Sequence, residues 1–268
     1  MARPVAAITG ASSGIGATFA RRLAATHDLI LVARRRERLE QLAAELGTSC
    51  EIVAADLAED SAVKTLAAKL GAEPRLELLV NNAGFGTKGL FWTASLESQE
   101  SMHRVHVMAT MQLTHAALGG MTARGRGGVI NVASIASFVR SAGNASYCST
   151  KSWMAYFTET LALELKAANS AVKVQSLCPG YTYSEFHDVL GVKRERLGPK
   201  SVWLTAEDVV DASLRGLDRG KLFVVPGWQY KLVAFLLPKL PTGLRLWIEG
   251  RATKSRSRQL LEGEATSR

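Results

Sequence analysis

A regular alternation of two kinds of segment constrains the fold of this chain more than any other feature. Short runs rich in β-branched residues have the length of buried strands, and they lie at 4–9, 29–33, 51–55, 76–80, 128–133, 172–177 and 222–225. Alanine- and leucine-rich segments of helical character separate them, at 15–26, 37–46, 60–70, 98–118, 147–167 and 206–217. This order predicts a single doubly wound α/β domain, with about seven parallel strands and helices on both faces. Ligands of such a domain bind at the carboxyl ends of the strands.

The composition is that of a globular protein, and it argues against several other classes. Of the 268 residues, 47% are hydrophobic and 21% are charged, so the chain can bury one large core. The net charge of +9 is spread along the chain without interleaved aromatic residues, and we expect no nucleic-acid partner. Three cysteines without metal-ligand spacing predict free thiols, no metal site and a cytoplasmic location. We expect neither a signal peptide nor a membrane-spanning run.

The first predicted strand runs into a glycine-rich loop, "TGASSGIG" at 9–16. Gly10, Gly14 and Gly16 lack a Cβ, so a phosphate oxygen can approach the backbone N–H groups at the positive end of the following helix. The simpler interpretation is a tight strand-to-helix turn. The position after the first strand and before the first helix is the one that a dinucleotide site requires, and it favours such a site.

The end of the second predicted strand bears on the choice of cofactor. An NAD site usually has a carboxylate there, whereas this chain has Ala33 followed by Arg34 and Arg35, and Asp28 lies at the opposite end of the strand. Two guanidinium groups suit a 2′-phosphate, and a bidentate contact contributes about 1.5–3 kcal/mol. The alternative is that one or both arginines are surface charges. We expect NADP(H) as the cofactor.

Six motifs in a fixed order resemble those of the short-chain dehydrogenases/reductases. They are "TGASSGIG" (9–16), "ADL" (55–57), "NNAG" (81–84), "GVINVAS" (128–134), "YCSTK" (147–151) and "CPG" (178–180), and the resemblance spans residues 4 to 226. It implies a Rossmann-type catalytic domain at 1–226, and we expect the apolar and basic segment 227–268 to be an extension packed on or beside it. It also implies a homodimer or homotetramer.

The resemblance assigns a role to each matching position. The catalytic residues would be Ser134, Tyr147 and Lys151, with His106 at a supporting position. The implied cofactor contacts come from Gly10, Ser12, Ser13, Gly14, Ile15 and Gly16 in the loop, Asp56 and Leu57 beside the adenine, Asn82, Ala83 and Gly84 in the cleft, Pro179, Gly180, Thr182 and Ser184 on the nicotinamide side, and Tyr147 and Lys151 on the catalytic helix. Of the last two, Lys151 would hold the nicotinamide ribose. Family members usually have threonine at the position of Ser184.

The spacing of Tyr147 and Lys151 is typical of proton-transfer chemistry on a helix. Residues four apart lie on one face, and a nearby ammonium is expected to lower the pKa of a phenol from its usual value of about 10. Ser134 would donate a hydrogen bond to the same substrate oxygen. Taken alone, the pair could also be two unrelated surface residues, because the motif is short.

His106 departs from the family pattern. The family has an asparagine there, which supports a water relay to the catalytic lysine. Imidazole can also hold a water, but it titrates near neutral pH. The alternative interpretation is a histidine that packs its helix against neighbours.

These features predict an NADPH-dependent enzyme that transfers a hydride reversibly to a ketone or aldehyde. The segment 181–202 would contain a substrate lid. The apolar segment 227–248 could close an apolar pocket, pack against a partner subunit, or rest on a lipid surface as a peripheral contact. The first use would suit a bulky apolar or oxoacyl substrate. The rival class is a non-catalytic NADP(H)-binding regulator or scaffold on the same fold.

Overall fold

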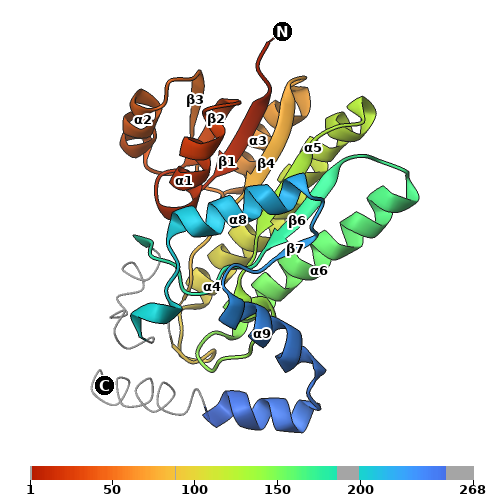
Figure 1. Ribbon diagram of the computed structural model, residues 1–268. Helices are drawn as coiled ribbons and strands as arrows, with labels where there is room; N and C mark the ends of the chain where they lie inside the picture. Colours follow the sequence, from red (N-terminus) through yellow and green to blue (C-terminus); the bar gives the residue numbers. More distant parts are fainter. Residues whose placement is uncertain (1, 88, 186–198, 252–268) are drawn as a thin grey trace.

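The computed structural model describes residues 2–87, 89–185 and 199–251, so most of the predicted lid lies outside the described residues. Seven strands form one parallel sheet in the order β3-β2-β1-β4-β5-β6-β7 (Figure 1), as the alternation predicted. The strands are β1 (Val5–Thr9), β2 (Asp28–Ala33), β3 (Cys50–Ala54), β4 (Leu76–Asn81), β5 (Gly128–Val132), β6 (Lys173–Leu177) and β7 (Phe223–Val224). The order reverses direction beside β1, which places a crevice between the carboxyl ends of β1 and β4.

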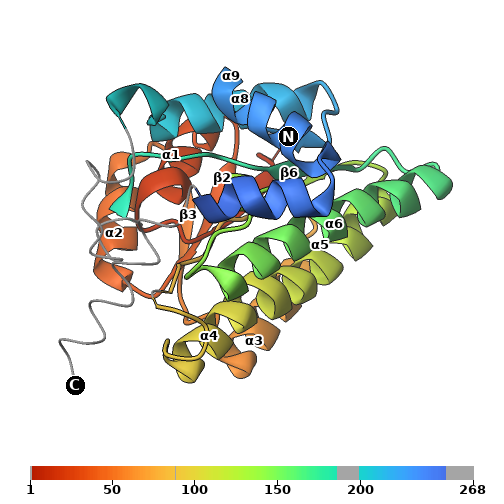
Figure 2. The same ribbon diagram turned by 90° about the horizontal axis from the view of Figure 1, so that it is seen from below.

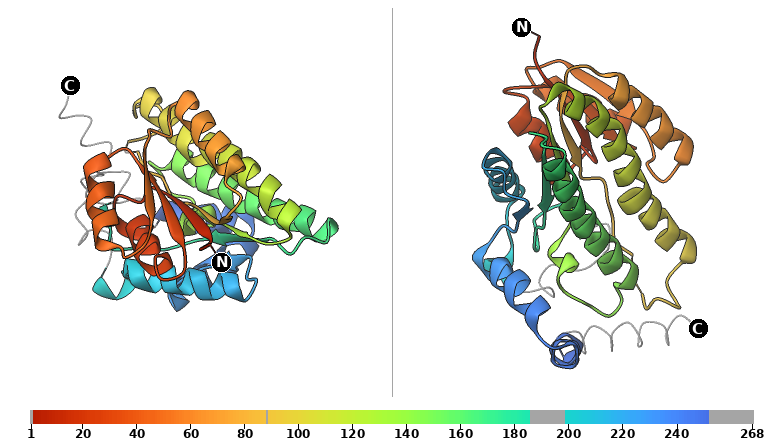
Figure 3. Two further views of the ribbon diagram at one scale, coloured as in Figure 1. Left: turned by 90° about the horizontal axis from the view of Figure 1, so that it is seen from above. Right: turned by 90° about the vertical axis from the view of Figure 1, so that its right-hand side faces the viewer.

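Helices cover both faces of the sheet (Figure 3). Alternate strand residues supply the two cores. One face carries α1 (Gly14–Leu23), α2 (Arg36–Glu45) and α8 (Ala206–Asp218), and the other carries α3 (Asp60–Ala72), α5 (Thr110–Arg124) and α6 (Ala145–Ala167). In β1, for example, Ala6 and Ile8 face the first layer while Val5 and Ala7 face the second. The doubly wound prediction is confirmed.

The helix predicted over 98–118 is not uniform. It begins as α4 (Leu96–His103), passes through a π-helical turn (Arg104–Ala109) and continues as α5. Single π-helical turns inside longer helices are often found at functional sites. His106 lies within this turn, on the side that faces α6.

Within the described residues, two further helices follow β7. They are α9 (Trp228–Leu236) and a helix over 242–251, and both lie beyond the lower end of the sheet in Figure 1, the end from which Figure 2 views the molecule. Tyr230 attaches α9 to the sheet domain, because its hydroxyl donates to the carbonyl of Val202 (2.6 Å) and accepts from the N–H of Tyr181 (3.1 Å). Among the described residues, no helix combines the length and the apolar character needed to cross a bilayer.

Candidate active site

The glycine loop after β1 forms a tight cradle of backbone atoms, in which side chains at the glycine positions would not fit. Gly10 and Gly14 have φ angles of +67° and +52°, in the left-handed region that favours glycine. A Cβ added to Gly16 would lie 2.2 Å from the carbonyl oxygen of Gly10, so no side chain fits there. The first turn of α1 contains no acidic residue, and its positive end is open to an anion. The loop therefore fits the diphosphate of a dinucleotide.

The loop after β4 is tied directly to the glycine loop. The Asn82 side-chain amide donates to the carbonyl of Thr9 (2.9 Å), and the N–H groups of Asn82 and Ala83 donate to the Thr9 hydroxyl (2.9 and 3.0 Å). These bonds hold the two loops together at the crevice. The polar groups of Asn82 are thus engaged in positioning the loops.

Arg35 lies beside the glycine loop and is held by several partners. Its guanidinium donates to the hydroxyls of Ser12 (2.9 Å) and Ser13 (3.2 Å) and contacts the carboxylate of Glu185 at 3.0 Å. Arg38 pairs with the same carboxylate. Desolvation alone would raise the pKa of Glu185, but hydrogen bonds from Arg38 and Arg35 hold it below its ordinary value. A carboxylate thus lies at the anion-binding end of these arginines.

Of the residues that follow β2 and β3, Arg34 and Asp56 lie at the surface and Leu57 lies in the core. Arg34 is 72% exposed and lies 3.9 Å from the carboxylate of Asp56, a long ion pair at the surface. Asp56 also accepts a hydrogen bond from the N–H of Ala58 (2.9 Å). The Leu57 side chain is buried in the core, so its packing serves the sheet and not an open cleft.

The loop after β6 closes the other side of the crevice. The carbonyl of Pro179 accepts from the N–H of Ile135 (2.8 Å), and the buried Thr182 donates to the carbonyl of Gly180 (3.0 Å). Ser184 lies close to the glycine loop: a Cβ added to Gly14 would be 3.0 Å from the Cβ of Ser184. The chain therefore passes from β6 to the glycine loop before it reaches Glu185.

Ser134, Tyr147 and Lys151 come together from β5 and α6. Ser134 and Tyr147 share a side-chain hydrogen bond. The Lys151 ammonium nitrogen lies 5.9 Å from the centre of the Tyr147 ring and donates to the carbonyl of Val132 (2.7 Å). It would also lie 3.5 Å from a Cβ on Gly84, so the lysine borders the loop after β4. The structure thus places all three beside the crevice.

Burial, and not the lysine charge, dominates the protonation of this cluster. Loss of water raises the pKa of Tyr147 to about 12; the hydrogen bond with Ser134 opposes this rise and Cys148 adds to it. Burial likewise lowers the pKa of Lys151 to about 7. The expectation that Lys151 lowers the tyrosine pKa is therefore wrong for the protein alone, because the lysine is itself desolvated and only partly charged at neutral pH.

His106 is fully buried, and protein groups engage both of its ring nitrogens. Its Nε2 accepts from the N–H of Phe85 (3.1 Å), so the hydrogen is on Nδ1, which donates to the Thr150 hydroxyl (2.9 Å). Thr150 in turn donates to the carbonyl of Tyr147 (3.0 Å). Burial and the nearby Lys151 lower the pKa of His106 well below its usual value, which favours the neutral ring over the titration near neutral pH that the sequence suggested.

Three residues of this region were not recognised from the sequence. For Arg38, its position one helical turn after Arg34 was the available signal. Glu185 and Thr150 gave no signal, since both act through partners that are distant in the chain.

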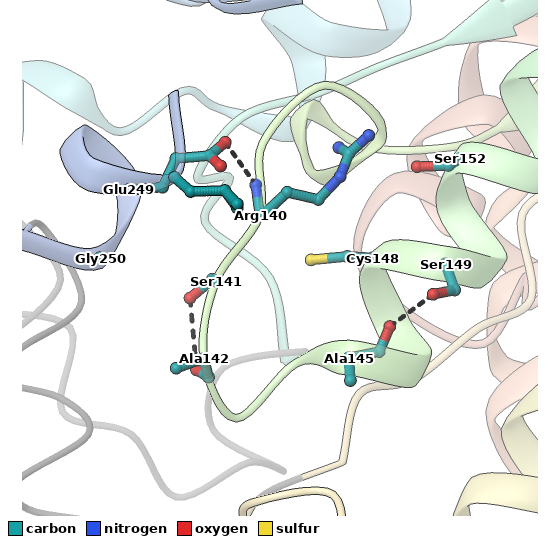
Figure 4. Close-up of a pocket in the computed structure, with 10 residues that line it drawn as sticks. Arg140, Ser141, Ala142, Ala145, Cys148, Ser149, Ser152, Glu249 and Gly250 are labelled. Carbon is teal, nitrogen blue, oxygen red and sulfur yellow. Dashed lines mark hydrogen bonds between the residues drawn. The ribbon is translucent and has the colours of Figure 1, made fainter. Parts of the chain in front are cut away.

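A cavity of about 540 Å³ lies beside α6 (Figure 4). The loop after β5, the first turns of α6 and the helix over 242–251 line it, through residues that include Arg140, Cys148 and Leu246. Glu249 reaches across and accepts from the N–H of Arg140 at 2.7 Å. Ser134, Tyr147 and Lys151 are not among the lining residues, whereas Cys148, the neighbour of Tyr147 in the chain, is.

The depressed lysine pKa has a consequence for stability. Between its folded value of about 7 and its unfolded value near 10.5, the unfolded chain binds more protons at Lys151, so stability rises with pH in this window. From pH 7 to pH 8.5 we expect a contribution of about 1–2 kcal/mol to the free energy of unfolding, which Lys151→Met should abolish. Urea unfolding of both proteins without cofactor measures it. Equal pH slopes for the two proteins would contradict the assigned pKa.

Comparisons with known proteins agree with this geometry. A family model described as short chain dehydrogenase matches residues 4–194. An NADP-dependent 3-hydroxy acid dehydrogenase of Escherichia coli is 34% identical over 214 residues, covering 76% of this chain and 85% of its own length. A short-chain dehydrogenase from Sphingobium yanoikuyae, solved in complex with NADPH, has a TM-score of 0.77 and 31% identity, covering 97% of this chain and 95% of its own.

A second solved structure is a bulky-bulky ketone specific alcohol dehydrogenase from Comamonas testosteroni. It has a TM-score of 0.72 and 28% identity, and the match covers 97% of this chain and 94% of that one. The sheet order, the glycine cradle and the cluster on α6 thus occur in a chain that a single family model matches over most of its length. This protein belongs to the short-chain dehydrogenase family of oxidoreductases.

Proposed function

We propose that this protein transfers a hydride reversibly between NADP(H) and a ketone or aldehyde. The observation that carries the proposal is the cluster of Ser134, Tyr147 and Lys151 beside Gly84, at the edge of the sheet where the glycine cradle also lies. A bound nicotinamide supplies the hydride in reduction and accepts it in oxidation. The protein has to bind the carbonyl oxygen and deliver a proton to it.

The buried tyrosine is suited to deliver that proton. With a pKa of about 12 in the protein alone, Tyr147 stays protonated at neutral pH, which is the form that reduction requires. Its hydroxyl and that of Ser134 share a hydrogen bond, so both point to one place, where they would donate to the developing alkoxide. Lys151 is held by the Val132 carbonyl, and in its charged form it would stabilise the phenolate after the transfer.

Removal of the proton donor should stop turnover and leave the cofactor site intact. Tyr147→Phe keeps the ring and its packing, so we expect NADPH binding within about threefold of wild type and a kcat lowered at least about a thousandfold. Fluorescence titration measures NADPH binding. NADPH consumption over a panel of ketones, aldehydes and oxoacyl thioesters measures kcat. A Tyr147→Phe enzyme with near wild-type kcat would remove the proposal. If wild-type protein binds NADPH but turns over no carbonyl, the scaffold alternative holds.

The choice of NADP(H) rests on the arginines beside the glycine loop. Arg35 is oriented by Ser12 and Ser13, and both Arg35 and Arg38 already hold an anionic group, the carboxylate of Glu185. No acidic residue follows β2 at the position where NAD sites carry one. The Escherichia coli relative is named NADP-dependent, and the Sphingobium yanoikuyae structure holds NADPH. We infer that a 2′-phosphate would displace Glu185 from these arginines.

Substitutions of the two partners in the Arg35–Glu185 ion pair should have opposite effects on the affinity for NADPH. Arg35→Ala should weaken NADPH binding about ten- to a hundredfold, with little effect on NADH. Glu185→Gln should tighten NADPH binding by removing a competing carboxylate. Arg36→Ala is the control, because Arg36 pairs with Glu40 on the surface of α2. Equal losses for NADPH and NADH in Arg35→Ala would contradict the preference.

We assign His106 a positioning role in place of the expected water relay. Its two ring nitrogens link the loop after β4, through Phe85, to α6, through Thr150. A Cβ on Gly84 would lie 2.6 Å from His106 Nε2, so the imidazole packs directly against the loop that borders Lys151. The neutral ring thus sets the separation of the cofactor loop from the catalytic helix.

Variants that keep one or neither of these bonds should separate positioning from proton transfer. His106→Phe removes both and should lower kcat about tenfold or more, whereas His106→Gln retains an acceptor for Phe85 and should recover most of the loss. Because the pKa of His106 is far below neutral, wild-type kcat/KM should show no histidine inflection between pH 6 and 8. An inflection there that disappears in His106→Gln would mean that the histidine titrates during turnover.

The substrate class that we propose is a bulky, apolar ketone or an oxoacyl compound. Support comes from the similarity to an alcohol dehydrogenase described as bulky-bulky ketone specific, whose match covers 97% of this chain. That match includes α9, which packs against the loop after β6 through Tyr230. The segment 227–251 would then be an extension that closes one side of the catalytic domain.

A further inference from the structure

The two C-terminal helices carry large apolar residues on the sides that face away from the domain. In the helix over 242–251, the carboxylate residue Glu249 is only 5% exposed, while Trp247 and Leu244 are 58% and 47% exposed. In α9, the buried residue is Tyr230, whose hydroxyl is fixed by two hydrogen bonds. Amphipathic helices on a globular domain normally turn the apolar stripe inward. The outer side of these helices is therefore built for surroundings other than water.

The exposed apolar residues of α9 form one continuous stripe. They are spaced at i, i+4, i+7 and i+8, which places them on a single side of the helix, and they are Trp228 (77% exposed), Leu232 (50%), Phe235 (61%) and Leu236 (46%). Leu244 and Trp247 continue the apolar surface on the next helix. We call these six residues the C-terminal apolar face. Isolated exposed apolar residues are ordinary, but six within 20 positions mark an interaction surface.

The charges around the face favour one kind of partner. Lys231, Lys239, Arg245 and Arg251 are the basic residues of the segment 227–251, and its one acidic residue, Glu249, is buried. The Lys239 ammonium lies 3.3 Å from the centre of the Phe235 ring and the Arg251 guanidinium 4.9 Å from that of Trp247, so the cations border the apolar residues. A second copy of this chain would bring the same positive charges and the same net +9 against them, whereas an anionic lipid surface complements them.

We propose that the C-terminal apolar face binds the surface of an anionic lipid bilayer, with the two helices lying in the interface. Tryptophan and phenylalanine side chains enter the boundary between headgroups and acyl chains, and Lys231, Lys239 and Arg251 contact lipid phosphates. Buried Tyr230 and Glu249 hold the helices on the catalytic body from the opposite side. This inference does not depend on the proposed reaction.

Sedimentation with vesicles tests the proposal on the full chain. The wild-type protein should bind vesicles of phosphatidylcholine with about one third phosphatidylglycerol at least tenfold more tightly than pure phosphatidylcholine, and high salt should weaken the binding. Trp228→Ser/Phe235→Ser should lower the affinity tenfold or more, and Lys231→Glu/Lys239→Glu should abolish the preference for the anionic lipid. Circular dichroism and NADPH binding verify that each variant is folded.

The matched control is Phe91→Ser/Trp92→Ser, which removes one phenylalanine and one tryptophan of similar exposure (58% and 75%) outside the face. It should bind vesicles as the wild type does. Equal binding to both lipids, or equal losses in the control and the Trp228→Ser/Phe235→Ser variant, would overturn the proposal. A third outcome would also overturn it. If Trp228→Ser/Phe235→Ser binds vesicles as the wild type does but changes from dimer to monomer in sedimentation velocity, the face joins two copies of the chain.

Discussion

The site depends on backbone segments that approach one another more closely than side chains would allow. A Cβ on Gly16 would collide with Gly10, a Cβ on Gly84 with His106, and a Cβ on Gly180 with the ring of Tyr230. Each of these contacts joins a loop at a strand end to a helix, so the glycines set how tightly the loops after β1, β4 and β6 converge. The parallel sheet brings these loops to one edge, and the glycines let them meet there.

Removal of water from that edge determines the protonation of its groups. Lys151, His106 and Tyr147 all shift toward their neutral forms, and burial is the largest cause in each case. Neutral tyrosine and neutral histidine are the forms that a proton donor and a fixed hydrogen-bonding link require. The π-helical turn at Arg104–Ala109 carries His106 into this dry region, which connects a local irregularity of the helix to the chemistry of the cluster.

The C-terminal helices are connected to the same edge. Tyr230 packs against Gly180 and bonds to Tyr181, and Glu249 bonds to Arg140 in the loop that precedes α6. The face that these helices present outward is apolar and bordered by cations. Contact of this face with lipid would place the crevice close to a phase in which apolar carbonyl compounds dissolve, consistent with the substrate class that we propose.

The sequence by itself determined the architecture, and it indicated the residues that we propose as the reacting groups. Seven apolar runs, a glycine loop and the Tyr147–Lys151 spacing are local patterns, and local patterns carry strand, helix and motif information. Only the tertiary structure decided the tyrosine and lysine pKa shifts, the hydrogen bonds at both ring nitrogens of His106, and the pairing of Glu185 with Arg35 and Arg38. These depend on desolvation and on contacts between residues far apart in the chain, such as Arg35 and Glu185 at a separation of 150 positions. Local periodicity in the sequence does not show which distant residues will bury a given side chain and so desolvate it.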